Sequence, residues 1–230
     1  MDETARRLAD LRQRLDRAAE AAGRDPAQIQ LMAVTKTQPA AVVTTAVAAG
    51  VSLVGENRVQ EADAKKPQVG LKAQWHLIGH LQTNKAARAV ALFDVVQSVE
   101  SSRLAQALER HAAAAGRRLG ILVQVNTSGA PTQSGVAPGE ARELVQFCAA
   151  QPHLSVGGLM TIGALSADPE PVRRSFRCLR QLRDELAAAA IPGVRLDCLS
   201  MGMSGDFELA IAEGATLVRL GSALFGPRAA

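Results

Sequence analysis

The feature that most constrains this chain is a regular alternation of short apolar strands with helix-like segments. Eight strands are predicted, and each except possibly the last is followed by a segment with helical spacing of apolar residues. Eight such repeats in 230 residues favour an α/β fold, a single-domain (β/α)8 TIM barrel, over two smaller domains. The predicted strands lie in Ile29–Pro39, Ser52–Val54, Trp75–Ile78, Phe93–Gln97, Leu119–Val125, Ser155–Met160, Arg195–Leu199 and Thr216–Leu220.

A helix is predicted before these repeats, because Leu8, Leu11, Leu15 and Ala18 recur at helical spacing ahead of Gly23. We therefore expect residues 1–230 to form one barrel domain with a leading N-terminal helix. An open, doubly wound sheet is the alternative for alternating strands and helices. Such a sheet would bind its nucleotide on a glycine-rich first turn, and the sequence has neither a GxGxxG motif nor a Walker P-loop.

Composition indicates an ordinary globular protein. Hydrophobic residues make up 47% and charged residues 21%, and no apolar run reaches the length of a membrane span. The N-terminus is charged from Asp2 onward, which argues against a signal peptide. Cys148, Cys178 and Cys198 are an odd number, widely spaced and in apolar surroundings, as expected for buried, reduced thiols. We therefore expect a cytoplasmic location and no membrane partner.

The net charge of +4 does not by itself indicate a nucleic-acid-binding protein. Aromatic residues, which stack on exposed bases, make up only 3% of the chain. The densest basic cluster lies on the predicted helix Pro171–Ala190, among apolar residues at helical spacing. We interpret its arginines as the solvated faces of an amphipathic helix and expect no nucleic-acid partner. These arginines are Arg173, Arg174, Arg177, Arg180 and Arg183.

In a barrel every strand ends at the same mouth, so the residues that follow the strands form one candidate site. Lys36 is the most informative of them, because it follows a buried-looking strand and precedes Pro39, which ends the strand and can begin a helix. A lysine placed there is a candidate for Schiff-base chemistry with a carbonyl compound. The alternative is a strand-end lysine that reaches solvent. The remaining lysines lie in polar or helix-like surroundings and are interpreted as solvated cations: Lys65, Lys66, Lys72 and Lys85.

The last two predicted strands end in small residues that suit an anion site. They are followed by Ser200-Met201-Gly202 and by Gly221-Ser222, and the region after strands seven and eight is the usual phosphate site of a barrel. Ordinary turns are the alternative explanation. Arg219 interrupts the apolar sequence Leu217–Leu220, and a buried guanidinium requires an anion or a planar acceptor. A structural ion pair with a carboxylate across the barrel is the alternative for Arg219.

Other polar residues near the strand ends have weaker claims to a function. His76 and His80 are four residues apart, but they lack the glutamate of a zincin helix and span a strand end. Hydrogen-bonded packing is therefore favoured for them, and no metal is expected. Glu56 and Glu61 are candidates for a general acid or base, although helix capping and solvated charge are commoner uses of such residues.

Seven motifs, in order from residue 33 to residue 226, resemble the pyridoxal 5′-phosphate homeostasis proteins. The resemblance covers nearly the whole chain, and the motifs together are highly specific. They are Ala33-Val34-Thr35-Lys36-Thr37, Gly55-Glu56-Asn57-Arg58-Val59-Gln60-Glu61, Trp75-His76-Leu77-Ile78-Gly79-His80-Leu81-Gln82-Thr83-Asn84-Lys85, Gln124-Val125-Asn126, Gly158-Leu159-Met160, Leu199-Ser200-Met201-Gly202-Met203-Ser204 and Val218-Arg219-Leu220-Gly221-Ser222-Ala223-Leu224-Phe225-Gly226.

The resemblance implies a barrel of the alanine racemase barrel-domain type that binds pyridoxal 5′-phosphate (PLP). By the same resemblance, Lys36 would form the internal aldimine with PLP, and Asn57 would lie near that bond. Arg219 would face the pyridine nitrogen of the cofactor. No catalytic residue is assigned.

The resemblance also implies that Ser200, Gly221 and Ser222, with neighbouring backbone amides, hold the phosphate of PLP. The chain departs from the family pattern at two positions. The usual tyrosine after Glu-Asn is Arg58 here, which could alter contacts with the cofactor. A lysine that is frequent in the fifth loop is Gln133, which puts in doubt any secondary PLP site that uses that lysine.

The residues favour a carrier of PLP over an enzyme. An arginine at the pyridine nitrogen disfavours protonation there and weakens the ring as an electron sink. The related alanine racemases use a tyrosine base from a second domain, whereas this sequence has no tyrosine and ends at Ala230. We therefore predict a protein without evident catalysis that holds PLP as a lysine aldimine and acts in intracellular PLP (vitamin B6) homeostasis. A narrow-scope PLP-dependent amino-acid racemase and a Schiff-base aldolase acting on a sugar phosphate are the alternatives.

The expected partners are PLP and, as recipients, PLP-dependent apoenzymes. A monomer or a weak dimer is expected.

Overall fold

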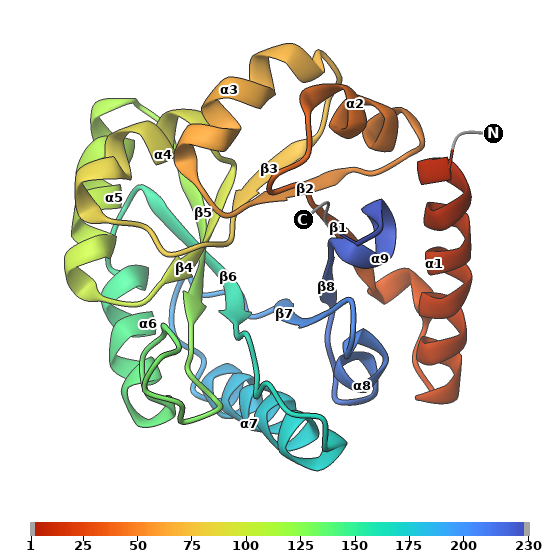
Figure 1. Ribbon diagram of the computed structural model, residues 1–230. Coiled ribbons are helices and arrows are strands. Elements are labelled where there is room, and N and C mark those ends of the chain that lie inside the picture. The colour runs from red at the N-terminus through yellow and green to blue at the C-terminus, as the bar shows by residue number, and fades with distance from the viewer. Residues whose placement is uncertain (1–2, 228–230) are drawn as a thin grey trace.

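The computed structural model describes residues 3–227, in which eight parallel strands close into a barrel inside a ring of helices (Figure 1). Each strand pairs with the next along the chain, and β8 pairs with β1 to complete the circle. The predicted (β/α)8 barrel is therefore confirmed. The strands are β1 (Gln30–Val34), β2 (Leu53–Glu56), β3 (Gln74–Leu77), β4 (Val95–Val99), β5 (Leu119–Gln124), β6 (Leu154–Met160), β7 (Cys198–Met203) and β8 (Leu217–Leu220).

Every strand is followed by a helix, including the last, after which the sequence left a helix open. The α-helices are α1 (Glu3–Ala21), α2 (Ala40–Ala48), α3 (Val59–Val69), α4 (Ala86–Leu92), α5 (Ser102–Ala114), α6 (Ala141–Ala149), α7 (Pro169–Ala188), α8 (Phe207–Ala212) and α9 (Ser222–Phe225). Short 3-10 helices lie at Pro26–Gln28, Thr83–Lys85 and Pro138–Glu140.

The predicted N-terminal helix is α1, which lies along the outside of the barrel (Figure 1). Leu8, Leu11 and Leu15 are buried on its inner face, as their spacing predicts. Helix α1 packs against α8 and α9 and also contacts α2. Helix α1 thus completes the outer layer at the place where the first and last strands meet.

Apolar side chains form two separate clusters. The larger cluster fills the space between the strands and the surrounding helices, and it contains Trp75 and Phe207 among its fully or almost fully buried members. The smaller cluster consists of Met32, Leu53 and Leu217. These three residues belong to β1, β2 and β8, and they form an apolar layer within the barrel.

Strand β7 differs from its prediction in a way that matters for the site. The sequence suggested a strand at Arg195–Leu199 followed by a loop, whereas β7 runs from Cys198 to Met203. Residues 195–197 lie ahead of β7, with Arg195 exposed, although the Arg195 N–H still donates to the Val156 carbonyl of β6 at 2.9 Å. As a result Ser200 lies inside the strand, two residues from its start.

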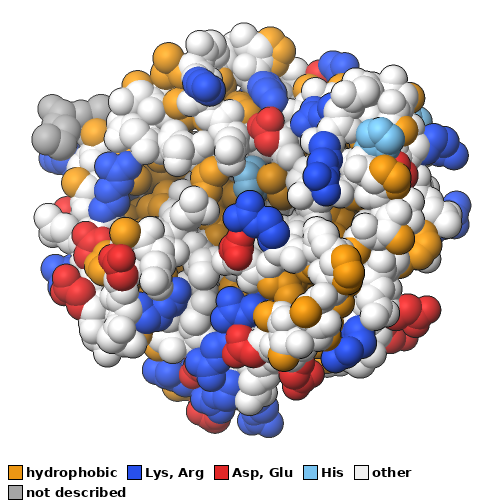
Figure 2. All heavy atoms as spheres, turned by 180° about the vertical axis from the view of Figure 1, so that it is seen from behind, with side chains coloured by type: hydrophobic (Ala, Val, Ile, Leu, Met, Phe, Trp, Pro, Cys, Tyr) orange, Lys and Arg blue, Asp and Glu red, His pale blue; other side chains and the backbone are white. Residues whose placement is uncertain are grey.

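The arginines of α7 also differ from their prediction as simply solvated residues. Basic side chains gather along the lower edge of the molecule in Figure 2, where Figure 1 places α7. Three of them approach the carboxylate of Glu213, a buried residue that follows α8. The distances from Arg173, Arg177 and Arg180 to the Glu213 carboxylate are 3.3, 3.2 and 3.7 Å. These ion pairs tie α7 to the end of α8.

The three cysteines are free thiols. Cys148 is buried, and burial raises the pKa of its thiol to about 12. Cys178 and Cys198 are partly buried, and burial raises both pKa values, that of Cys198 to about 11. Such thiols are poor nucleophiles at neutral pH.

In the part of the chain that the structure describes, none of the helices is both long enough and apolar enough to cross a bilayer.

Candidate functional site

A cavity of about 490 Å³ opens at the carboxyl ends of the barrel strands. This volume lies in the range of ordinary small-molecule sites. Its wall includes apolar side chains such as those of Ile78, which follows β3, and Met160, the last residue of β6. The polar part of the wall comes from β8 itself and from the segments that follow β1, β2, β7 and β8. It includes Lys36, Asn57, Ser204, Arg219, Gly221 and Ser222. Five of the six residues expected from the sequence therefore meet in one cavity.

A larger cavity of about 630 Å³ lies between α1, α7 and α8 and does not involve the strand ends. Arg14, Arg173 and Glu208 are among its lining residues. We assign the candidate site to the strand-end cavity, because that cavity combines apolar walls with converging polar groups from several strands.

Lys36 reaches the cavity from a tight turn directly after β1. The buried residue Thr35 continues the strand, and the N–H of Gln38 donates to the Thr35 carbonyl across the turn, at 3.0 Å. Thr37 has a positive φ of 65°, which is unusual for a β-branched residue. Pro39 then occupies the N-cap position of α2, as its fixed φ favours. The turn directs the half-buried Lys36 side chain to the mouth instead of into α2.

Asn57 occupies the first position after β2, where its side-chain oxygen Oδ1 is buried and accepts no hydrogen bond from the described residues. Its backbone is packed closely against Gly79, in the loop after β3. A Cβ atom at Gly79 would lie only 2.2 Å from the Asn57 carbonyl oxygen, so only glycine allows this approach. The glycine in the His-Leu-Ile-Gly-His sequence thus serves to place Asn57.

Arg219 is buried in β8 at the floor of the cavity. Its Nη1 donates to Ser200 Oγ at 2.8 Å, and its Nη2 donates to the Thr161 carbonyl oxygen at 2.7 Å. Burial lowers the pKa of Arg219 to about 10, so the guanidinium remains charged at neutral pH. Among the described residues no carboxylate forms an ion pair with Arg219, and its two acceptors are neutral oxygens. The alternative of an ion pair across the barrel is therefore wrong.

Ser200 does not line the cavity, although it was expected to contact a phosphate there. Because β7 extends to Met203, Ser200 is fully buried within the barrel. Its hydroxyl accepts from Arg219 and donates to Gln97 Oε1 at 2.7 Å, and Gln97 Nε2 lies 2.9 Å from His76 Nδ1. Ser200 thus belongs to a buried polar layer beneath the cavity.

Ser204 takes the place at the cavity wall that Ser200 does not reach. Its Oγ accepts from the backbone N–H groups of Gly221 and Ala223, both at 3.2 Å. These bonds join the loop after β7 to the loop after β8. Gly221 has no side chain and that of Ser222 is small, which leaves this part of the wall open, and the hydroxyls of Ser204 and Ser222 can bind oxygen atoms of a ligand.

Several other polar residues at or near the strand ends are engaged away from the cavity. His76 is buried, and this burial lowers its pKa to about 4. His80 is exposed, and its Nδ1 lies 2.8 Å from Glu100 Oε1. Asn126 donates to the carbonyl oxygens of Ala130 and Gln133 within its own loop. Across residues 3–227, no group of three or more His, Cys, Asp or Glu side chains is arranged to hold a metal ion.

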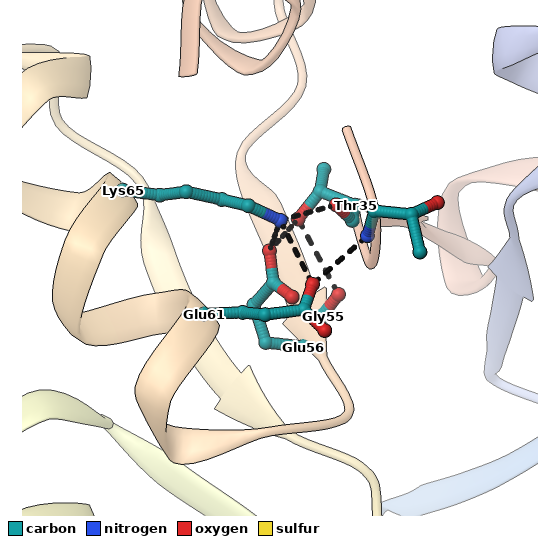
Figure 3. A network of polar contacts seen from close by, with 6 residues as sticks. Thr35, Gly55, Glu56, Glu61 and Lys65 are labelled. Atoms are coloured by element: carbon teal, nitrogen blue, oxygen red, sulfur yellow. Dashed lines mark hydrogen bonds and ion pairs between the residues drawn. The ribbon is translucent and has the colours of Figure 1, made fainter. Parts of the chain in front are cut away.

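Sequence reasoning missed Lys65, which was expected to be a solvated cation. Its side chain is buried beneath the Lys36 turn, where Nζ donates to the Thr35 carbonyl oxygen at 2.7 Å and to Glu56 Oε1 at 2.8 Å (Figure 3). Glu56 is fully buried, which raises its pKa despite the opposing effects of Lys65 and Thr35. The i, i+4 spacing of Glu61 and Lys65 on α3 was the available signal, but such pairs are common on exposed helix faces.

Comparison with known proteins supports this picture at the level of the family. Residues 7–229 match the family described as alanine racemase, N-terminal domain. The chain is 42% identical over 229 residues to the pyridoxal phosphate homeostasis protein of Pseudomonas aeruginosa, covering 99% of this chain and 97% of that protein. It is 40% identical over 223 residues to the protein of the same name from Aquifex aeolicus, and the match covers 96% of this chain and 97% of that protein.

Among solved structures, PipY of Synechococcus elongatus with PLP bound superposes with a TM-score of 0.85. It is 40% identical in sequence, and the match covers 97% of this chain and 100% of PipY. Alanine racemase of Corynebacterium glutamicum, at 20% identity and a TM-score of 0.72, shares the fold over 61% of its own length. The chain therefore belongs to the family of the pyridoxal phosphate homeostasis proteins, within the fold of the alanine racemase N-terminal domain.

Proposed function

We propose that this protein binds PLP in the strand-end cavity, attaches it reversibly to Lys36, and acts in intracellular PLP homeostasis without catalysing turnover. The observation that carries the proposal is the convergence on one cavity of Lys36, Arg219 and the two loops that contain Ser204 and Ser222. The names of the relatives and the PLP bound to PipY support the same cofactor. The whole of residues 1–230 is proposed to act as one PLP-binding domain.

The described residues fit this cofactor. Lys36 and Arg219 supply two cationic side chains to the cavity, which favours an anionic ligand. The orphaned Oδ1 of Asn57 is an acceptor that a bound ligand or a reoriented amine could satisfy. When bound, PLP supplies an aldehyde that reacts reversibly with an amine and a ring that draws electrons from the attached carbon.

The residues of this chain would divide the work of holding the cofactor. Lys36 would provide the amine, with Asn57 beside it. Arg219, which stays charged at neutral pH, would disfavour a proton on a ring nitrogen that faces it. We propose that Ser204 contributes to the phosphate site with Gly221 and Ser222, and that Ser200 supports Arg219 from below.

The cavity offers little for catalysis beyond this. Among its described lining residues, only Lys36 and Arg219 have ionisable side chains, and Arg219 is a cation at neutral pH. Racemisation by two bases needs a second proton carrier opposite the lysine. This shortage supports a carrier, whose recipients we propose to be PLP-dependent apoenzymes in the cytoplasm.

The test is to incubate the protein with PLP, reduce it with borohydride and locate the pyridoxyl group by peptide mass spectrometry. The adduct is expected on Lys36, and Lys36→Ala should lose at least about nine-tenths of the covalent label while Lys72→Ala, at an exposed lysine, keeps it. Undiminished labelling of Lys36→Ala would refute the assignment. An assay for D-amino acids formed from L-amino acids decides between a carrier and a racemase. A carrier should form no more D-amino acid than a sample without protein.

A further inference from the structure

The turn that carries Lys36 adopts a backbone conformation that needs support from elsewhere. Thr37 has a φ of 65°, in a region that costs a β-branched residue on the order of 1–3 kcal/mol. Such a conformation persists only where surrounding contacts enforce it. The turn contains Lys36 between Thr35 and Thr37, so any contact that fixes both neighbours also fixes the starting point of the Lys36 side chain.

Two residues of α3 make contacts on both sides of Lys36. Glu61 Oε2 accepts the backbone N–H of Thr37 at 2.9 Å. Lys65 Nζ donates to the backbone carbonyl of Thr35 at 2.7 Å, and it also lies 3.2 Å from Glu61 Oε2. Figure 3 shows the Lys65 side chain extending from α3 toward Thr35, with the carboxylates of Glu56 and Glu61 beside its ammonium group.

The ammonium group of Lys65 uses all of its donors in this arrangement. Its three acceptors are Thr35 O, Glu56 Oε1 and Glu61 Oε2, which matches the three N–H groups of an ammonium ion. The Thr35 hydroxyl adds a bond of 2.6 Å to the same Glu56 oxygen. Burial alone would raise the pKa of Glu61, but the Thr37 N–H and Lys65 lower it overall, which keeps the carboxylate ionised at neutral pH.

A purely stabilising role is a poor explanation for this network. A buried ion pair contributes little net stability, because removing both charges from water costs about as much as their attraction returns. One oxygen of Glu56 also lacks a hydrogen-bond partner among the described residues. What the arrangement does provide is geometry, since it attaches the backbone before and after Lys36 to one helix.

We propose that Glu61 and Lys65 are positioning residues, which clamp the Thr35–Thr37 backbone and so aim the Lys36 amine into the cavity. The inference deepens the proposed function, and the part of its test that uses PLP rests on that function. The clamp itself is a property of the chain without cofactor and can be measured in its absence.

The first experiment measures amide hydrogen exchange in the cofactor-free protein. Glu61→Ala removes the acceptor of the Thr37 N–H, so exchange in a peptide spanning residues 35–38 should accelerate at least about fivefold. Glu61→Gln keeps a side-chain oxygen at that position and should restore much of the protection. Gln60→Ala, at an exposed neighbour on the same helix, is the matched control and should exchange like the unmodified protein.

The second experiment separates covalent attachment from non-covalent binding. The rate at which Lys36 becomes labelled by PLP and borohydride should fall about tenfold or more in Glu61→Ala, because small misplacements of a reacting group cost large factors in rate. Pyridoxine 5′-phosphate, which has no aldehyde, should bind Glu61→Ala within about twofold of its affinity for the unmodified protein. A general loss of folding would weaken both measurements together.

Lys65→Met should slow labelling in the same way. Lys66→Met is its matched control, since Lys66 donates to the carbonyl of Leu92 at the end of α4 instead of to the Lys36 turn. Should Lys65→Met not fold, the Glu61 variants still decide the matter. Unchanged exchange and unchanged labelling in Glu61→Ala would overturn the clamp. Failure of the unmodified protein to label at Lys36 would instead overturn the proposed function, and hydrogen exchange would still decide whether the clamp exists.

Discussion

At the scale of single residues, the floor of the cavity is defined by a hydrogen-bond chain that has one direction. Arg219 donates to Ser200, whose hydroxyl donates to the oxygen of Gln97. Gln97 must then present its amide NH2 group to His76 Nδ1, so the neutral imidazole carries its proton on Nε2. A protonated His76 could not accept from Gln97, and this part of the floor therefore requires a neutral histidine.

This requirement predicts that His76 makes the protein sensitive to acid. The unfolded chain binds a proton at a histidine of ordinary pKa, near 6.5, whereas burial keeps the folded residue neutral until about pH 4. Protons therefore favour the unfolded state as the pH falls between these values, at up to roughly 1.4 kcal/mol per pH unit. The free energy of unfolding in urea should accordingly be about 2–3 kcal/mol lower at pH 4.5 than at pH 7 through His76 alone.

His76→Asn is the informative variant, because it keeps an acceptor for Gln97 but does not titrate. Its stability should change less between pH 7 and pH 4.5 than that of the unmodified protein. Equal pH dependence in the unmodified protein and His76→Asn would show that other groups, such as Glu61 with its lowered pKa, govern the response.

The residues of the site differ in how far sequence could locate them. Lys36, Asn57 and Gly221 directly follow or closely follow buried strands, and strand ends of a barrel meet at one mouth whatever the details of the loops. Ser200 was misplaced because its position depends on where β7 ends. Lys65 was missed because helix spacing shows that it faces Glu61 but not that this face of α3 is turned toward the Lys36 turn.

At the scale of elements, β7 is the strand whose geometry shapes the site most. It pairs with β8 through Ser200 opposite Leu217 and Met203 opposite Arg219, so the register shifts between these pairs. Gly202 lies within the shift and has a φ of 92°. A bulge of this kind is hard to read from sequence, because a run of small residues with serine and glycine also suits a loop. The bulge carries the strand far enough for Ser204 to reach the loop after β8.

Replacing the glycine in this bulge should destabilise the protein. In Gly202→Ala the new methyl group would lie 2.5 Å from the Cβ atom of Ala210, and the backbone would keep its unfavourable φ. We expect a loss of about 1–4 kcal/mol in the free energy of unfolding. Urea denaturation measures this loss, with Gly139→Ala as the control, because a methyl group there meets open space at an ordinary φ. A change below about 0.5 kcal/mol in Gly202→Ala would contradict the packing described for the bulge.

At the scale of the whole molecule, the fold was the most predictable property. Eight apolar strands separated by helical segments admit few parallel arrangements, and a closed barrel buries every strand on both faces. Element ends were less predictable, since they depend on caps, bulges and contacts between distant segments. The extent of the folded unit also stays a prediction, because the alternation of elements does not establish whether α1 unfolds together with the barrel.

The packing of α1 predicts that it belongs to the same cooperative unit as the strands. Leu11 is buried in the large apolar cluster that also contains Trp75, the sole tryptophan of the chain, on β3. Leu11→Ala should therefore lower the free energy of unfolding by about 2–5 kcal/mol, and tryptophan fluorescence and far-ultraviolet circular dichroism should report the same lower urea midpoint. Gln13→Ala, on the exposed face of α1, should leave both midpoints within error of the unmodified protein. A fluorescence midpoint that did not respond to Leu11→Ala, with only a partial loss of helical signal, would mean that α1 unfolds independently of a barrel that is stable without it.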